Sequence, residues 1–252
     1  SWEILAAAFI NFISLFLFYL VIFPLSAQTA SIQVSGAHWK GYIEPNEKGI
    51  YVDLIKLAYN DDAVHFDIGS FVRAKRVFNT KKSDILVGVF KSDLLDLNDA
   101  ILPNHHLDIE HPTVAIFDQR KNKINNIKHL NGLVVAWYEG YDYQKYLPKQ
   151  AIKYPVNDLR QAFKLLASGR IDVVVDHSYN IDESDKLIFK TWELAPERPI
   201  WLAFQDTKRG NKLKNLFDKR IKYLISTGQI KKIFGDEYER ANFDKVYPKT
   251  NK

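Results

Sequence analysis

Short apolar segments alternate with amphipathic ones along most of this chain, and a hydrophilic stretch at 118–128 interrupts the alternation once. Short apolar runs are typical of buried strands, whereas apolar residues at helical spacing are typical of helices that cover a sheet. Their alternation predicts an α/β fold. The interruption divides the fold into two blocks of strands and helices.

Each block has a predicted order of elements. The first block contains predicted strands at 31–35, 63–68 and 84–89 and helices at 51–60 and 70–79. The second contains predicted strands at 133–137, 152–156 and 171–175, a helix at 141–146, and a second helix between Asn157 as N-cap and Gly169 as C-terminal stop. Further apolar runs at 113–117, 187–194 and 200–204 predict strands at the block boundaries.

These boundary strands predict how the blocks are connected. The run at 113–117 leads into the second block, and the segment between Pro196 and Pro199 leads back out of it. We therefore expect a discontinuous first lobe, residues 31–113 plus 200–252, and an inserted second lobe, residues 118–195. Two crossing hinge strands would join two Rossmann-like βα lobes.

The N-terminal region has a different composition, because residues 4–23 form an almost uninterrupted apolar run that Pro24 ends. About 20 apolar residues is long for the core of a signal peptide and just enough to cross a bilayer. Small residues supply candidate cleavage sites after Ala27 and Ala30. We predict that residues 1–27 are a signal peptide, with an uncleaved membrane anchor as the alternative.

Composition narrows the function classes. The chain has no cysteine, which leaves no disulfide framework, thiol nucleophile or lipid-anchored Cys, and favours a Gram-negative periplasm for an exported protein.

The net charge is +5, but the basic stretch 208–232 has apolar residues at helical spacing, so its lysines are expected to form the solvated face of a helix rather than a nucleic-acid surface. The histidines 105, 106 and 111 lack metal-ligand spacing, and no metal or cofactor is expected.

The order of motifs resembles the bacterial extracellular solute-binding proteins of family 3, which have the type 2 periplasmic-binding fold. The resemblance spans residues 31–240 and is carried by Trp39 and by the segments 49–54, 71–74, 83–88, 130–135, 140–143, 165–172, 201–204 and 228–230. It implies a monomeric, non-enzymatic periplasmic protein that captures a small polar solute between its lobes for an ABC permease or a sensor protein. A tethered sensory module and a cyclohexadienyl-type dehydratase, with Glu139, Asp176 or His177 as its acid or base, are the alternatives.

One departure from the family changes the expected solute. Amino-acid receptors of this family usually follow the third strand with a Thr and then an Arg that binds the ligand carboxylate, whereas this chain has the segment 90–96, which contains Asp93 and no Arg. Lys91 or Arg73 could substitute, although neither the position nor the geometry is equivalent. The usual α-amino-acid mode is therefore in doubt, and an amine or a ring-bearing solute is also expected.

Candidate ligand-binding residues follow from the resemblance and from the aromatic residues near the predicted strand ends. Asp176 stands just beyond a strand, where family members hold a ligand ammonium group. Aromatic side chains there could stack on a ring or an amine. The complete set of candidates is Trp39, Tyr42, Phe71, Arg73, Phe90, Lys91, Trp137, Tyr141 and Asp176.

Overall fold

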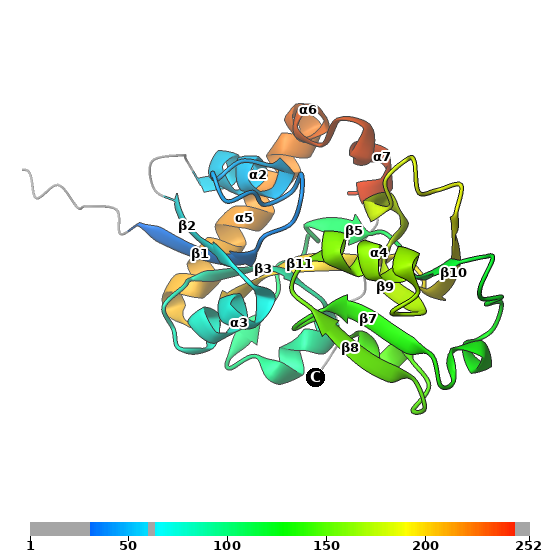
Figure 1. Ribbon diagram of the computed structural model, residues 1–252. Helices are drawn as coiled ribbons and strands as arrows, with labels where there is room; N and C mark the ends of the chain where they lie inside the picture. Colours follow the sequence, from blue (N-terminus) through cyan, green and yellow to red (C-terminus); the bar gives the residue numbers. More distant parts are fainter. Residues whose placement is uncertain (1–30, 60–63, 245–252) are drawn as a thin grey trace, which may run out of the picture. The chain divides into compact units, whose positions relative to one another are not determined.

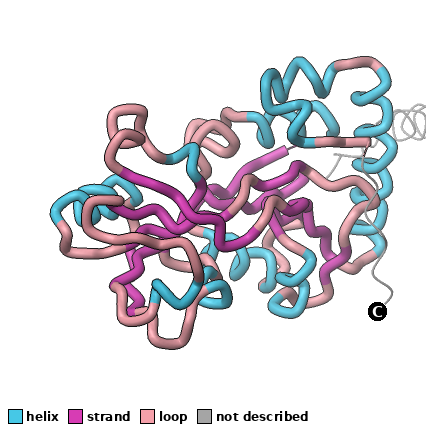
Figure 2. The backbone as a smooth tube through the Cα atoms, turned by 90° about the vertical axis from the view of Figure 1, so that its right-hand side faces the viewer, coloured by secondary structure: helices cyan, strands magenta, loops and turns pink. Residues whose placement is uncertain are grey.

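The computed structural model describes residues 31–59 and 64–244, so the predicted signal peptide or anchor at 1–27 lies outside the described residues. Within those ranges no helix is both long and apolar enough to cross a membrane. Two separate sheets form the core of the part that is described (Figures 1 and 2).

The first sheet has three parallel strands on one side. Its strand order is β2-β1-β3-β11-β4, with β5 paired to β11, and its strands are β1 (Ile32–Ala37), β2 (Val64–Gly69), β3 (Ile85–Val89), β4 (Ala100–Ile101), β5 (Asp108–Glu110) and β11 (Arg198–Gln205). β1 runs parallel to β2 and β3, whereas β11 runs antiparallel to β3. The carboxyl ends of the three parallel strands therefore meet at one edge.

Helices cover both faces of the first sheet. One face packs against α2 (Ile50–Tyr59), α5 (Lys208–Ser226) and α6 (Gln229–Phe234), and α7 (Tyr238–Ala241) follows them. The other face packs against α3 (Phe71–Asn79), and the 3-10 helix η2 (Lys91–Asp96) follows β3. Alternate residues of β3 serve the two faces, with Ile85 and Val87 toward α2 and α5 and Leu86 toward α3. This two-sided burial explains the continuous apolar run in the sequence.

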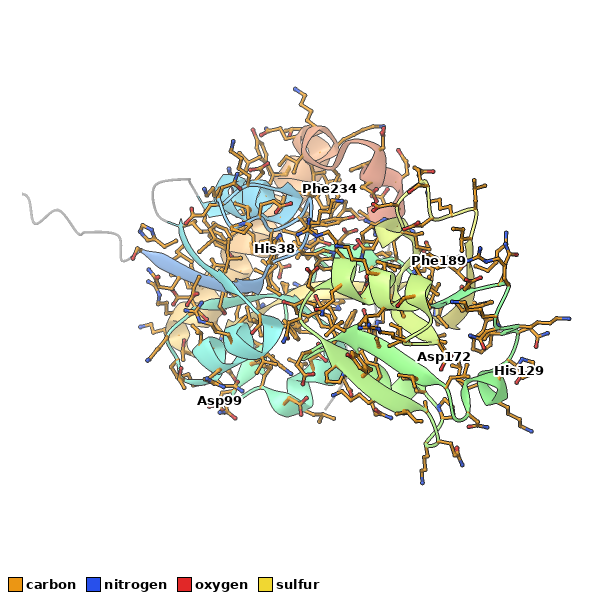
Figure 3. The ribbon with its side chains drawn as sticks, viewed as in Figure 1. His38, Asp99, His129, Asp172, Phe189 and Phe234 are labelled. Carbon is orange, nitrogen blue, oxygen red and sulfur yellow. The ribbon has the colours of Figure 1, made fainter. Side chains whose placement is uncertain are left out.

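The second sheet has the order β10-β6-β9-β7-β8, formed by β6 (Thr113–Asp118), β7 (Val134–Tyr138), β8 (Ile152–Val156), β9 (Val173–His177) and β10 (Phe189–Ala195). α4 (Leu159–Ser168) covers one face. The other face is covered by the segments around the 3-10 helices η3 (Ile127–Leu130) and η4 (Tyr143–Tyr146). In Figure 3, Phe189 and Asp172 lie in this half of the described chain, and Phe234 lies beside α6 in the other half.

Two short crossings connect the sheets. Glu110 pairs with Arg198 in the first sheet, and Thr113 pairs with Ala195 in the second. The dipeptides between these pairs, at 111–112 and 196–197, therefore run side by side. Both contain a proline, which has no backbone N–H to donate to a sheet and so suits a position between two ladders.

The predicted α/β fold with two lobes and two crossing segments is confirmed. The predicted strand at 152–156 and the stop at Gly169, whose φ is 75°, agree with the structure. Other local predictions were wrong. The predicted helix at 141–146 is only the 3-10 turn η4, and Asp158 rather than Asn157 caps α4, because the Asp158 carboxylate accepts from Arg160 N at 2.9 Å. β5 and η2 were not predicted from the sequence.

Candidate functional site

The carboxyl ends of the parallel strands of both sheets face a common cavity of about 890 Å³. In α/β sheets this edge is the usual ligand site, because the chain leaves the strands there in loops whose side chains are free to converge. His38 and Trp39 follow β1, Phe90 follows β3, and Asp176 and His177 end β9. All of these residues line the cavity, and its volume is in the range that suits a small molecule.

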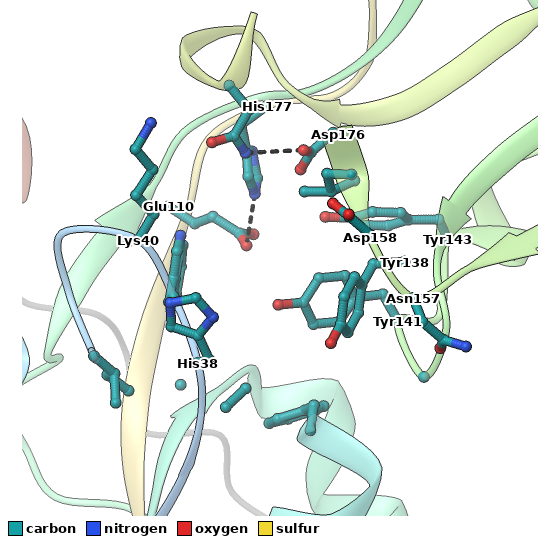
Figure 4. Close-up of a pocket in the computed structure, with 18 of the residues that line it drawn as sticks. His38, Lys40, Glu110, Tyr138, Tyr141, Tyr143, Asn157, Asp158, Asp176 and His177 are labelled. Atoms are coloured by element: carbon teal, nitrogen blue, oxygen red, sulfur yellow. Dashed lines mark hydrogen bonds and ion pairs between the residues drawn. The ribbon is translucent and has the colours of Figure 1, made fainter. Parts of the chain in front are cut away.

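Asp176 is a buried carboxylate that lines the cavity, and its residue is 3% exposed. Its Oδ2 accepts from Asn180 Nδ2 at 2.8 Å, and the backbone N–H of His177 also donates to the carboxylate (Figure 4). Burial raises the pKa of Asp176 above its usual value, and these bonds oppose the rise only in part. A carboxylate in this situation gains most from a cation placed in the cavity.

Glu110 joins the two lobes through charged hydrogen bonds. Its Oε1 lies 3.1 Å from His177 Nε2, and its Oε2 accepts from Arg198 Nε at 3.3 Å. The other ring nitrogen of His177 lies 3.2 Å from the carbonyl oxygen of Pro112, which can only accept. Both ring nitrogens thus face acceptors, and this arrangement suits an imidazolium.

Opposing effects act on His177. Burial favours the neutral imidazole, but the hydrogen bond to Glu110 and the charges of Glu110 and Asp176 outweigh it and raise the pKa of His177. The cluster of Glu110, His177 and Arg198 then carries one negative and two positive charges.

Aromatic side chains from both lobes close the cavity. Trp39 Nε1 donates to Tyr179 Oη across the cleft at 2.6 Å, and the rings of Phe71 and Tyr141 approach to 6.3 Å between centroids. Figure 4 shows Tyr138 and Tyr141 directed toward the side of the cavity where His38 and Glu110 lie. Rings on opposite walls can enclose a flat or cationic group.

Gly140 brings the second lobe close to the first. Its φ is +94°, a conformation that side chains rarely adopt, and a Cβ built on it would lie 2.5 Å from Val72 Cγ2. Val72 belongs to α3 and Gly140 follows β7, so this approach occurs across the cleft. Like the Trp39–Tyr179 hydrogen bond, this approach is a direct contact between the two lobes.

Asp93 lies in the segment after β3, where the family resemblance predicts a cationic side chain. Its Oδ2 accepts from Phe90 N at 2.8 Å, and the side chain lines the cavity. Burial raises the pKa of Asp93, and the charges of Lys145, Lys75 and Arg198 oppose this rise. The loop after β3 therefore presents a carboxylate to the cleft.

The predicted candidates fall into two groups. Those that line the cavity are Trp39, Phe71, Phe90, Tyr141 and Asp176, and those that do not are Tyr42, Arg73, Lys91 and Trp137.

The second group has other contacts. Tyr42 is 7% exposed and accepts from Arg240 Nη2, and Trp137 is 1% exposed and donates to the Tyr141 carbonyl. Arg73 pairs with Asp67 at 2.6 Å, and the Lys91 ammonium lies 5.3 Å from the centre of the Trp201 ring.

Glu110 and Arg198 line the cavity but were not predicted from the sequence. Both lie beside a crossing segment, and their pairing brings together residues that are 88 positions apart. A charged residue two positions from the proline of each crossing segment was the available signal. Among the described residues, no group of three or more His, Cys, Asp or Glu side chains could hold a metal ion.

A scan of the sequence against protein-family models gives no match, and a search of curated proteins finds no relative. Solved structures do match. An ancestral arginine-binding protein bound to arginine has a TM-score of 0.64 and 16% identity, over 83% of this chain and 98% of that chain. A histidine kinase sensor domain with similarity to periplasmic binding proteins has a TM-score of 0.66 and 19% identity, over 82% and 95%.

An ABC uptake transporter substrate-binding protein from Streptococcus pneumoniae with bound histidine has a TM-score of 0.64 and 12% identity, over 85% of this chain and 95% of that chain. At such identities the likeness concerns the fold. The chain is similar to two-lobed binding proteins along nearly their whole length.

Proposed function

We propose that this protein is an exported binding protein that captures a small polar solute, amino-acid-like, amine or ring-bearing, between its lobes. The observation that carries the proposal is the Asp176 carboxylate, which is 3% exposed and lines a cavity of about 890 Å³. Among the residues that the structure describes, its direct hydrogen-bond partners are neutral donors, Asn180 Nδ2 and the backbone N–H of His177. Such a group costs free energy unless a cation joins it. A bound ammonium or guanidinium group would offset that cost.

Capture would proceed by closure of the lobes. The lobes are taken as residues 32–110 with 198–244 and residues 113–195, and the crossings at 111–112 and 196–197 act as the hinge. Contacts across the cleft, such as Trp39 with Tyr179, form only when the lobes approach. A solute that contacts both walls would therefore favour the closed population.

The proposed role is binding without turnover, as a monomer in the periplasm that serves an ABC permease or a sensor protein. It is supported by the solved structures that match, because their names describe an arginine-binding protein, a transporter substrate-binding protein and a sensor domain. A sensory role would require that the apolar run at 4–23 stay attached. Mass measurement of the exported protein distinguishes the two, since a free receptor would start near Gln28 or Ser31.

A thermal-shift screen tests the proposal directly. A solute that binds only the folded protein raises the melting temperature with its concentration. We expect one or more amino acids, amines or aromatic metabolites to do so, and prephenate and arogenate to remain unconverted. If no small solute changes the melting temperature at millimolar concentration, the proposed function is wrong.

A further inference from the structure

Arg198 is a cavity-lining guanidinium whose role the proposed function leaves open. It begins β11, beside the hinge, and its side chain is 22% exposed. The guanidinium carbon lies 3.4 Å from the centre of the Phe90 ring. Phe90 is the residue directly after β3. Arg198, which belongs to β11, therefore places its guanidinium group beside the segment after β3, and that segment contains no arginine of its own.

The hydrogen bonds of Arg198 leave part of its donor capacity unused. A guanidinium group carries five N–H donors. The Nε group donates to Glu110, and one Nη1 group donates to Tyr146 Oη, which leaves three N–H groups. Within residues 31–59 and 64–244 nothing else is seen to accept from them. The Phe90 ring and the Glu110 bond fix the plane of the group, so these donors have a set direction.

The charges around Arg198 form a dipole. Glu110 is shared between His177 and Arg198, so the three groups sum to one positive charge when His177 is an imidazolium. Asp176, the next residue to His177, supplies a negative charge and keeps acceptor positions free beside its bonds to Asn180 and the backbone. A solute with one negative and one positive group close together could bind Arg198 with the negative group and Asp176 with the positive one.

We propose that Arg198 binds the carboxylate of a zwitterionic α-amino acid whose ammonium group binds Asp176. The two groups lie on opposite sides of the hinge, Arg198 on the first sheet and Asp176 on the second. The solute headgroup therefore bridges the lobes. This assignment rests on the proposed function, and it revises the expectation that the missing arginine after β3 makes the usual α-amino-acid binding mode doubtful. Arg73 and Lys91 are not needed for this role.

The test compares amino acids with the amines that lack only the carboxylate. The probes are L-arginine with agmatine, L-histidine with histamine, L-lysine with cadaverine, L-tyrosine with tyramine, and the other L-amino acids. Dissociation constants are measured by calorimetry for the unmodified protein, Arg198→Gln, Arg198→Lys and the control Arg170→Gln. Arg170 is exposed and does not belong to the residues that line the cavity.

At least one amino acid is expected to bind the unmodified protein, and to bind it more tightly than its matched amine. Because Arg198→Gln loses charged hydrogen bonds to the carboxylate, it should lower the affinity for that amino acid about 30-fold and the affinity for the matched amine less than about twofold. Arg198→Lys keeps the charge but not the planar guanidinium, so its affinity for the amino acid should lie between that of the unmodified protein and that of Arg198→Gln. Arg170→Gln should match the unmodified protein.

Three results would overturn the assignment. The first is a protein that binds amines or other solutes but no amino acid, and the second is equal weakening of amino acid and amine by Arg198→Gln. Either would leave the proposed capture function standing. The third is an absence of binding by any solute, which would contradict the capture function as well. Melting temperatures of the variants identify a loss that comes from unfolding.

Discussion

The two walls of the cleft differ in whether their buried carboxylate has cationic partners. Within the described part of the chain, Asp176 on the wall from the second sheet has no cationic side chain as a hydrogen-bond partner, whereas Glu110 on the wall from the first sheet contacts both His177 and Arg198. Both carboxylates are buried, with residues 3% and 8% exposed. The difference teaches that burial alone does not mark a ligand site. A buried carboxylate that already has cationic partners holds the lobes together, and one that lacks them is available to a solute.

The largest expected effect on solute affinity comes from removing the charge of Asp176 on the wall from the second sheet. Asp176→Asn keeps the shape but removes the charge, so the affinity for the best solute should fall about 100-fold, as for the loss of one partner of a buried charge pair. Calorimetry measures the change. The matched control is Asp142→Asn, because Asp142 also lines the cavity but its side chain is 71% exposed. Equal effects of both substitutions would contradict the contrast between the walls.

A second prediction concerns the approach of the walls at Gly140. Gly140→Ala places a Cβ against Val72, which should oppose closure and lower solute affinity about tenfold. Adding Val72→Ala should restore most of the affinity by removing the obstacle. The melting temperature should stay lowered in both variants, because the strain at a positive φ is local. Failure of Val72→Ala to restore binding would show that this contact does not limit closure.

A smaller effect is expected at the hydrogen bond between Trp39 and Tyr179. Trp39→Phe keeps an aromatic ring but loses the donor, which should weaken solute binding about fivefold. Tyr179→Phe should have a similar effect. The double variant should be no weaker than either single one, since both remove the same bond. Additive losses measured by calorimetry would mean that the two side chains act separately.

The smallest effect is a pH dependence from His177, which faces Glu110, Asp176 and His111. Its pKa is raised in the folded protein, so the stabilisation is fully present below about pH 6.5 and is lost as the pH rises through the raised pKa. The melting temperature should therefore decrease over that range. His177→Gln should remove this part of the decrease, and an unchanged pH profile in the variant would contradict the role of His177.

The sequence predicts the sheets better than it predicts the cavity lining. β3 is readable because its residues are buried between helices, which gives a continuous apolar run that depends on the local sequence alone. Arg198 was missed because its role depends on the pairing of β5 with β11, which joins distant parts of the chain. The placement of Trp137 in the core could not be predicted, because an aromatic residue in a strand can face the core or the cleft, and its neighbours in sequence do not decide which.

The central claim is that a solute held between the walls closes the lobes, and a distance measurement tests it most directly. The chain has no cysteine, so Asn215→Cys on α5 and Lys123→Cys beyond β6 allow one spin label on each lobe. Both positions are exposed. Pulsed electron resonance should show a broad distance distribution that the best solute shifts to a narrow one, and no such shift when Asp176→Asn is added. A solute that binds tightly while the distribution stays unchanged would contradict the account.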